Sequence, residues 1–184
     1  EIDKGRQVYI IFPLIEESAK MDYENLMKGY ENVKAYFPEP KYWISMVHGR
    51  QPAEQKELNM KRFVEHDTQI MVSTTVIEVG VNVPNASVMV IESAEKFGLS
   101  QLHQLRGRVG RSHHQAYAYL LTEPNRKITP QAQKRLDAIQ LLEDLGAGFH
   151  LAMHDLEIRG AGELLGDSQS GEMQEIGFHL YSEM

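Results

Sequence analysis

The chain has 184 residues, of which 42% are hydrophobic and 24% charged, and 26 acidic residues against 19 lysines and arginines give a formal charge of −7. This composition is typical of a soluble protein of about one domain with an appendage, and the net charge argues against indiscriminate binding of nucleic acid. The absence of cysteine excludes disulfides and thiolate metal sites and fits a reducing cytosol. No apolar run approaches the ~20 residues of a membrane helix. The chain opens without methionine directly before an apolar run, so we expect it to be a piece of a longer protein.

Strands and helices are predicted to alternate along the first two thirds of the chain. The run VYIIF is apolar without alternation, as in a strand buried on both faces, and Trp43 is expected to be buried as well. Such alternation implies an α/β fold, a largely parallel sheet with helices on both faces. The expected strands are 8–12, 42–47, 69–73, 87–91 and 116–121, and the expected helices are 16–36, 52–65 and 99–106.

The pattern changes after Thr122. Residues 130–145 and 149–158 are predicted to be helical, and a glycine-rich tail, residues 159–171, follows them. We therefore expect an α/β domain over residues 1–123 and a small helical hairpin over residues 124–184.

Three polar segments are predicted to lie near one edge of the sheet. Ligands of parallel sheets gather at the carboxyl ends of the strands. His48-Gly49-Arg50 follows the second predicted strand and Ser73-Thr74-Thr75 ends the third, and we expect the arginine segment, residues 104–111, to lie nearby. The fold alone therefore predicts a ligand site at this edge of the sheet.

The arginine segment, QLRGRVGR, is an isolated basic region in an acidic chain, because no Asp or Glu occurs between Lys96 and Thr122. Arginine is always charged, and its planar fork of donors fits phosphate oxygens. Arginines three residues apart beside glycines suit the γ-phosphate of a nucleotide, where an arginine finger accelerates phosphoryl transfer by ~10³ or more. The alternative for a lone RGR is a solvated basic helix end.

These residues carry a family resemblance. QLHQLRGRVGR resembles motif VI of superfamily 2 helicases, STTVIEVGVNVP resembles motif V, and VHGR resembles the motif after the second strand of the same domain. Together the motifs cover residues 8–121, in the order of the C-terminal RecA-like motor domain. The front is similar to RecG-type branched-DNA helicases. SHHQAYAYLL and HDLEIRGAGELLGDSQSGEMQEIGFHLY are similar to the bacterial transcription-repair coupling factor. Both families share this tail, the TRG or translocation motif, and an engineered chimera is a third possibility.

The resemblance implies a role for each motif residue. Arg108 and Arg111 would reach the γ-phosphate, and Gln104 would help to hold the nucleotide. Gly80, Asn82 and Gly107 would line the nucleotide side, although many relatives have Asp in place of Asn82. Arg159 and Gln169 would couple nucleotide closure to movement on DNA. Backbone-directed, sequence-independent DNA contacts would come from His48, Gly49, Arg50, Ser73, Thr74 and Thr75.

Neither a GxxxxGK[ST] loop nor an acidic DExx box occurs in the sequence. ATP and Mg²⁺ would therefore be bound mainly by a missing N-terminal RecA-like domain, and the 184 residues alone should be inactive. The resemblance implies half of an ATP-dependent helicase or translocase acting on double-stranded or branched DNA in the bacterial cytoplasm, in fork reversal or transcription-coupled repair. RNA polymerase is a possible partner of the whole protein. We expect no resident metal site and no membrane association. An RNA helicase half and a non-catalytic module remain the alternatives.

Overall fold

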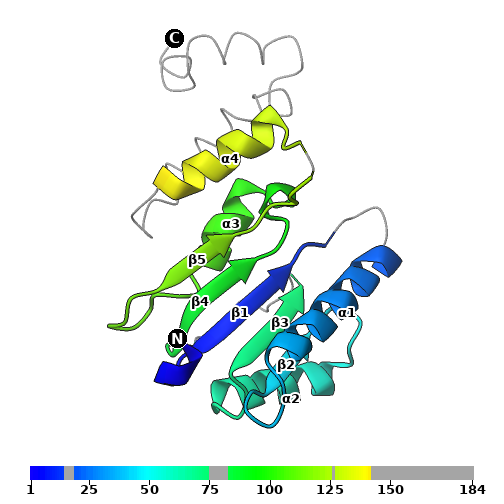
Figure 1. Cartoon of the computed structure of the whole chain (residues 1–184), viewed down its shortest axis with the longest axis vertical. Coiled ribbons are helices and arrows are strands. Elements are labelled where there is room, and N and C mark those ends of the chain that lie inside the picture. Colours follow the sequence, from blue (N-terminus) through cyan, green and yellow to red (C-terminus); the bar gives the residue numbers. More distant parts are fainter. Residues whose placement is uncertain (15–18, 75–82, 126, 142–184) are drawn as a thin grey trace. The chain divides into compact units, whose positions relative to one another are not determined.

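The computed structural model describes residues 1–14, 19–74, 83–125 and 127–141. Five strands form one sheet in the spatial order β2-β3-β1-β4-β5, and all neighbours are parallel (Figure 1). The predicted α/β fold with a parallel sheet is thus confirmed. In chain order the elements are η1 (Ile2–Lys4), β1 (Gln7–Phe12), α1 (Ala19–Tyr36), β2 (Ile44–Val47), α2 (Ala53–Val64), β3 (Ile70–Thr74), β4 (Ala86–Ile91), η2 (Ala94–Lys96), α3 (Leu99–Arg106), β5 (Tyr117–Leu120) and α4 (Pro130–Leu141).

The chain divides into two compact units. The first comprises Glu1–Lys96 with Leu105–Glu123 and contains the whole sheet, α1 and α2; the second comprises Phe97–Gln104 with Pro124–Met184. Residues 97–104 were expected in the α/β domain over residues 1–123, and they group with the unit that contains α4. Within the second unit Arg135 donates from Nε to the carbonyl oxygen of Phe97 at 3.2 Å, a contact between residues far apart in sequence.

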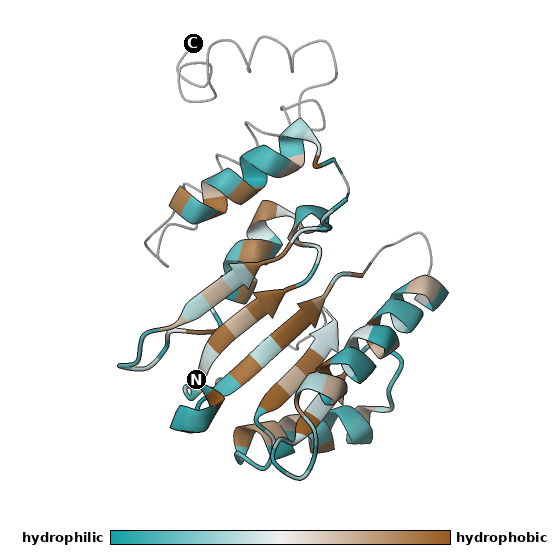
Figure 2. Cartoon of the chain, in the orientation of Figure 1, coloured by the Kyte–Doolittle hydropathy of each residue, from teal (hydrophilic) through white to brown (hydrophobic). Residues whose placement is uncertain are grey.

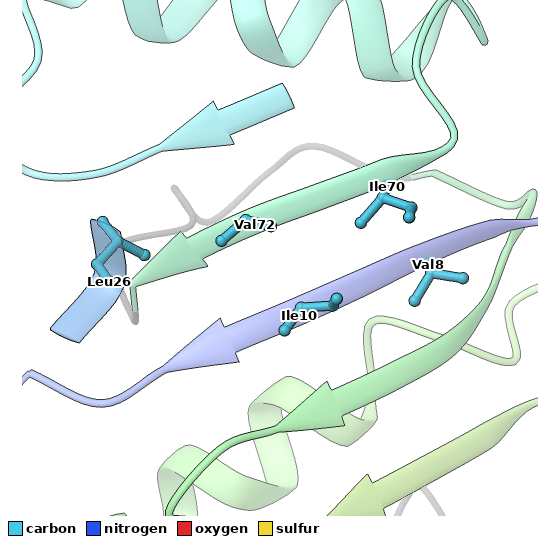
Figure 3. Packing of buried hydrophobic residues seen from close by; sticks show 5 residues of the cluster. All are labelled: Val8, Ile10, Leu26, Ile70 and Val72. Atoms are coloured by element: carbon cyan, nitrogen blue, oxygen red, sulfur yellow. The ribbon is translucent and has the colours of Figure 1, made fainter. Parts of the chain in front are cut away.

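One face of the sheet is packed against α1. Successive residues of a strand point to opposite faces, so Val8 and Ile10 share one face of β1. They form a buried cluster with Ile70 and Val72 of β3 and with Leu26 of α1 (Figure 3). Burial of aliphatic side chains of this size contributes about 1.5–3 kcal/mol each. This cluster fixes α1 over the centre of the sheet.

The opposite face is packed against α2. The ring of Tyr9 meets that of Phe63 edge to face, with centroids 4.9 Å apart. The buried Gln7 amide donates from Nε2 to the carbonyl oxygens of Phe63 and Thr68, at 2.6 and 2.8 Å. The chain moves one way from β1 to β2 and the other way from β2 to β3, so right-handed crossovers place α1 and α2 on opposite faces. Figure 2 shows hydrophobic residues concentrated on β1, β3 and β4, with many hydrophilic residues along α1 and α2.

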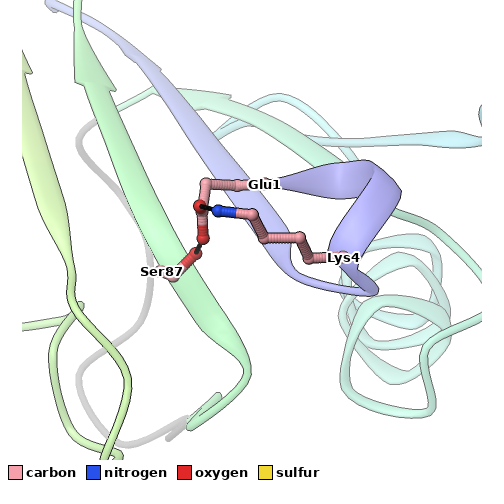
Figure 4. Close-up of polar contacts among 3 residues, drawn as sticks. All are labelled: Glu1, Lys4 and Ser87. Carbon is pink, nitrogen blue, oxygen red and sulfur yellow. Dashed lines mark hydrogen bonds and ion pairs between the residues drawn. The ribbon is translucent and has the colours of Figure 1, made fainter.

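A polar contact ties the residues before β1 to β4. The Glu1 carboxylate accepts from Lys4 Nζ at 2.6 Å and from Ser87 Oγ at 3.2 Å (Figure 4). The hydrogen bond with Lys4 lowers the pKa of Glu1. Because Ser87 is buried in β4, this contact anchors η1 at the amino end of the sheet.

Several side chains differ from the sequence-based expectations. Trp43 is 41% exposed rather than buried, because it lies before β2 begins and contributes its backbone to Gln69. The apolar residues Leu58, Phe63 and Val64 predict one buried face of α2, yet Leu58 and Val64 are exposed. Asn59 is buried instead, because its amide donates to the carbonyl oxygen of Met46 at 2.7 Å. Helix α4 begins at Pro130 as expected, but the predicted helices beyond Leu141 lie outside the described residues.

A glycine inside α1 allows close packing against β1. A Cβ built on Gly29 would lie 2.1 Å from Cζ of Phe12 and 2.4 Å from its Cε1. Real Cβ contacts are not this short, so the Phe12 ring occupies space that any other residue at position 29 would need. A residue that weakens a helix in isolation is therefore required here for packing.

Candidate nucleotide and DNA surfaces

The ends of β2 and β3 lie side by side at the carboxyl edge of the sheet. Val47 is in register with Ser73, and His48 follows Val47 directly. The structure thus brings together two of the three polar segments predicted to meet at this edge. Ser73 and Thr74 are nevertheless buried, and the Ser73 hydroxyl donates to the carbonyl oxygen of Thr74 at 2.8 Å. In this conformation their hydroxyls do not reach the surface.

The turn after β2 is held by its own polar groups. His48 donates its backbone N–H to Oε1 of Gln51 at 3.1 Å, and Gln51 returns a hydrogen bond to the His48 carbonyl oxygen at 3.2 Å. The Arg50 backbone N–H lies 3.3 Å from Nδ1 of His48, which accepts when the imidazole is neutral. Burial lowers the pKa of His48, and the charges of Arg50 and Lys56 lower it further. The turn therefore favours a neutral histidine.

Gly49 and Arg50 form the exposed part of this turn. No heavy atom lies within 4 Å of a Cβ built on Gly49, so nothing inside the protein requires glycine there. The Arg50 guanidinium carbon lies 5.2 Å from the centroid of the Tyr23 ring on α1. His48 is only 7% exposed, so Arg50 supplies the accessible charge of the turn.

The arginine segment has a defined backbone conformation. Gly110 has a φ of +79°, in the left-handed region that favours glycine, and its built Cβ would lie 3.3 Å from Cβ of Ala116. Val109 is buried and anchors the segment, while Arg111 is exposed. Arg111 donates from Nε to the Gly107 carbonyl oxygen at 2.7 Å. Its terminal nitrogens have no hydrogen-bond or ion-pair partner in the part of the chain that the structure describes.

The arginine segment connects α3 to β5. The segment leads into Tyr117, the first residue of β5, because a parallel crossover must return to the amino edge before the next strand begins. Burial raises the pKa of Tyr9, in β1, to about 12, and the charges of Arg108 and Arg111 oppose this rise. The arginines thus lie within electrostatic reach of β1.

The remaining predicted site residues are only partly described. Gln104 is exposed on α3 and belongs to the second compact unit, whereas Gly107 is half-buried in the first. Thr75, Gly80, Asn82, Arg159 and Gln169 lie outside the described residues. Within the described ranges, no three His, Asp or Glu side chains converge as a metal site. None of the helices described there is long and apolar enough to cross a membrane.

A cavity that sequence reasoning missed lies between α1 and the carboxyl ends of β1, β4 and β5. It has a volume of about 480 Å³, and its lining includes Phe12, Gly29, Glu92, Lys96 and Glu123. Lys96 forms an ion pair with Glu123, and burial raises the pKa of Glu92. The sequence carried one signal for this cavity, because Glu92 directly follows a buried strand at the edge where ligands gather.

With this geometry in view, comparison with known proteins identifies the domain. The profile of the helicase conserved C-terminal domain matches residues 1–113, more than half of the chain. The chain belongs to this helicase family. The predicted resemblance to a superfamily 2 helicase C-terminal domain is therefore confirmed.

The relatives of this helicase domain come from both families that the sequence resembled. The transcription-repair-coupling factor of Escherichia coli is 52% identical over 184 residues, which are 100% of this chain and 15% of that protein. The ATP-dependent DNA helicase RecG of Synechocystis sp. is 51% identical over 174 residues, which are 93% of this chain and 20% of that protein. Both families align along the same region, so a natural relative of both can carry the features of each without being an engineered chimera.

Solved structures confirm the fold of the helicase domain. RecG bound to a three-way DNA junction superposes with a TM-score of 0.70 and 38% identity, over 95% of this chain and 22% of that chain. A yeast DEAD-box splicing factor superposes with a TM-score of 0.53 at 20% identity and shares the fold alone. The RecA-like fold predicted from the motifs is thereby established.

Proposed function

We propose that this domain is the C-terminal motor half of an ATP-dependent translocase that acts on double-stranded or branched DNA in repair. The observation that carries the proposal is the superposition on RecG bound to a three-way DNA junction, which extends over 95% of the chain. The chain spans only 15% and 20% of the two relatives described above, so the activity belongs to a longer protein.

Arg111 is the residue best placed to act on a nucleotide. Its Nε is held by the Gly107 carbonyl oxygen at 2.7 Å, which orients the guanidinium without neutralising it. The exposed terminal nitrogens can then donate to two oxygens of a γ-phosphate, the geometry that arginine favours for phosphate. Arg108 is half-buried on the same segment, and its positive charge would also stabilise the γ-phosphate.

ATP and Mg²⁺ would be held mainly by a partner RecA-like domain, with this chain supplying part of the phosphate contact. The Arg111 guanidinium suits a phosphate, but no converging set of metal-binding carboxylates occurs among the residues described. When bound, ATP would supply the transferable phosphoryl group and its Mg²⁺ would neutralise phosphate charge. This chain would contribute the arginine, and a partner RecA-like domain would contribute the phosphate cradle.

The turn after β2 would supply backbone-directed contacts to DNA. Arg50 offers an accessible positive charge, and the open space beside Gly49 allows a phosphate to approach the backbone. Helix α2 begins at Ala53, just beyond this turn, and the positive end of its dipole favours the same anion. Contacts of this kind are independent of base sequence.

The test uses the intact protein that contains this domain together with its N-terminal motor half. Arg111→Ala should lower DNA-stimulated ATP turnover by at least ~10²-fold and leave DNA affinity nearly unchanged, because the finger acts on the transition state. Arg62→Ala, which removes an arginine of α2, is the matched control and should retain turnover. Loss of DNA affinity with normal turnover would instead place Arg111 on the DNA surface.

The same assay separates the remaining alternatives. Stimulation by duplex or branched DNA supports a DNA translocase, whereas stimulation by RNA alone would indicate an RNA helicase. Absence of turnover with any nucleic acid would indicate a non-catalytic module. The whole protein would work in the bacterial cytoplasm, and its likeness to the transcription-repair-coupling factor makes RNA polymerase a candidate partner.

A further inference from the structure

We infer that Tyr23 is a positioning residue that holds the Arg50 side chain for contact with a DNA phosphate. The inference rests on the proposed function, because it assigns a support to an arginine already placed on the DNA surface. Tyr23 belongs to none of the helicase motifs in the sequence. It lies on α1, whereas Arg50 lies in the turn after β2.

Tyr23 contacts two residues of this turn. Its ring centroid lies 5.2 Å from the Arg50 guanidinium carbon and 5.3 Å from the His48 ring centroid, with the two rings inclined at 62°. The Arg50 backbone N–H lies 3.3 Å from Nδ1 of His48, so each of the three residues contacts the other two. His48 is buried and Tyr23 half-buried, so a fixed pair of rings supports an exposed arginine.

A ring is a suitable support for a cation that must bind an anion. The electron-rich face of tyrosine attracts a guanidinium within about 6 Å without contributing an opposite charge. The contact with Tyr23 therefore does not cancel the charge of Arg50, and the exposed side chain can still meet a phosphate. A long side chain that is already held in place also loses less rotamer entropy on binding.

The backbone of the turn restricts Arg50 from the other side. Gln51 bridges the turn, since its Oε1 accepts from the His48 backbone N–H at 3.1 Å and its Nε2 donates to the Met46 carbonyl oxygen at 3.1 Å. The Arg50 backbone is thus fixed to β2 while its side chain crosses to α1. Tyr23 contacts the guanidinium end of the side chain, and Gln51 holds the backbone from which the side chain starts.

The inference is tested by DNA titrations of the chain at several salt concentrations, with a fluorescently labelled duplex as the probe. The slope of log K against log salt is negative, and Arg50→Ala should reduce its magnitude by about 0.9, the value for one lost phosphate contact. Tyr23→Leu should weaken binding by about two- to five-fold, as expected for an exposed cation–π contact, and should also make the slope less steep. Tyr23→Phe keeps the ring and should restore binding.

A double-mutant cycle distinguishes positioning from direct contact. If Tyr23 acts through Arg50, Tyr23→Leu should have no further effect in the Arg50→Ala background. The matched control is Tyr30→Leu, which removes another α1 ring that carries a cation, Lys34 Nζ at 5.5 Å. It should leave the salt slope unchanged. Additive losses from Tyr23→Leu and Arg50→Ala would show that Tyr23 contacts DNA itself and would overturn the inference.

Different results would contradict the DNA role of Arg50 and the positioning role of Tyr23. If Arg50→Ala leaves DNA binding unchanged, the DNA role of Arg50 is wrong and the inference falls with it. If Arg50→Ala makes the slope less steep but Tyr23→Leu does not, the DNA role stands and positioning is refuted. An NMR measurement needs neither variant to bind DNA, because side-chain protons of Arg50 over the Tyr23 ring should be shifted upfield. Unshifted Arg50 resonances in the wild-type chain would also overturn the inference.

Discussion

Substitution of Gly29 by alanine is a sharp test of how α1 packs on the sheet. Two effects oppose each other at this position. Alanine in a helix interior is favoured over glycine by about 1 kcal/mol. Its Cβ, however, would lie 2.1 Å from Cζ of Phe12, so the ring must retreat by about 1 Å or more before ordinary contact is restored.

The packing effect should be the larger one. Overpacking a well-packed site costs typically about 1–3 kcal/mol, and we take about 2 kcal/mol here, because the clash is severe but Phe12 also lines the cavity beside α1 and its ring can move in part. We therefore expect Gly29→Ala to destabilise the chain by about 1 kcal/mol net. Urea denaturation should show a lower midpoint with an unchanged m-value.

The sign of the effect can be reversed by design. In a Phe12→Leu background the ring is absent, and Gly29→Ala should then stabilise by up to about 1 kcal/mol, because only the helix preference remains. Gly49→Ala is the matched control, since nothing lies near its built Cβ, and it should leave stability unchanged. If Gly29→Ala stabilises the wild-type chain, the close packing of Phe12 on α1 is wrong.

Three further predictions concern the edge of the sheet. The folded-state pKa of His48 lies below its ordinary value of 6.5, so the unfolded chain takes up the proton first as the pH drops. Stability should therefore fall from about pH 6.5 down through the lowered pKa. Denaturation at a series of pH values should show that His48→Gln lacks this loss. The pKa of Glu92 is raised above its ordinary value of 4.5, so stability should decline as the pH rises from 4.5 through the raised pKa. Glu92→Gln should flatten this profile of stability against pH. An unchanged profile would exclude Glu92 as the source of the decline. Gly49→Ala should weaken DNA binding while unfolding at the same urea concentration as the wild type, and undiminished binding would show that no phosphate approaches the turn there.

The fold was predictable because burial dominates the strands. All residues of β3 are buried, and β1 has only one half-buried residue, so their apolar runs could be recognised without knowing their neighbours. Polar core residues could not be recognised in this way. Gln7 and Asn59 are buried because distant carbonyl groups accept their amide hydrogens, and those pairings exist only in the folded chain.

The candidate site was predictable where it follows from strand ends and not where it depends on contacts. The position of His48 after β2 came from the alternation of strands and helices, and the structure places it at the expected edge. The support of Arg50 by Tyr23 joins residues of separate elements, and no sequence pattern announces it. Burial of Ser73 was likewise missed, because a hydroxyl at a strand end can turn to its own backbone instead of outward.

The order of strands in the sheet has a consequence for how this domain is made. β1 lies at the centre, yet its two neighbours follow about 60 and 80 residues later along the chain, so nearly all of its pairing is non-local. During synthesis the apolar run of β1 emerges long before β4 can cover its second edge. We therefore expect this domain to fold in milliseconds to seconds, which is slow for its size. Until β3 and β4 are translated, the exposed apolar strand β1 is prone to aggregation and depends on chaperones or on rapid translation.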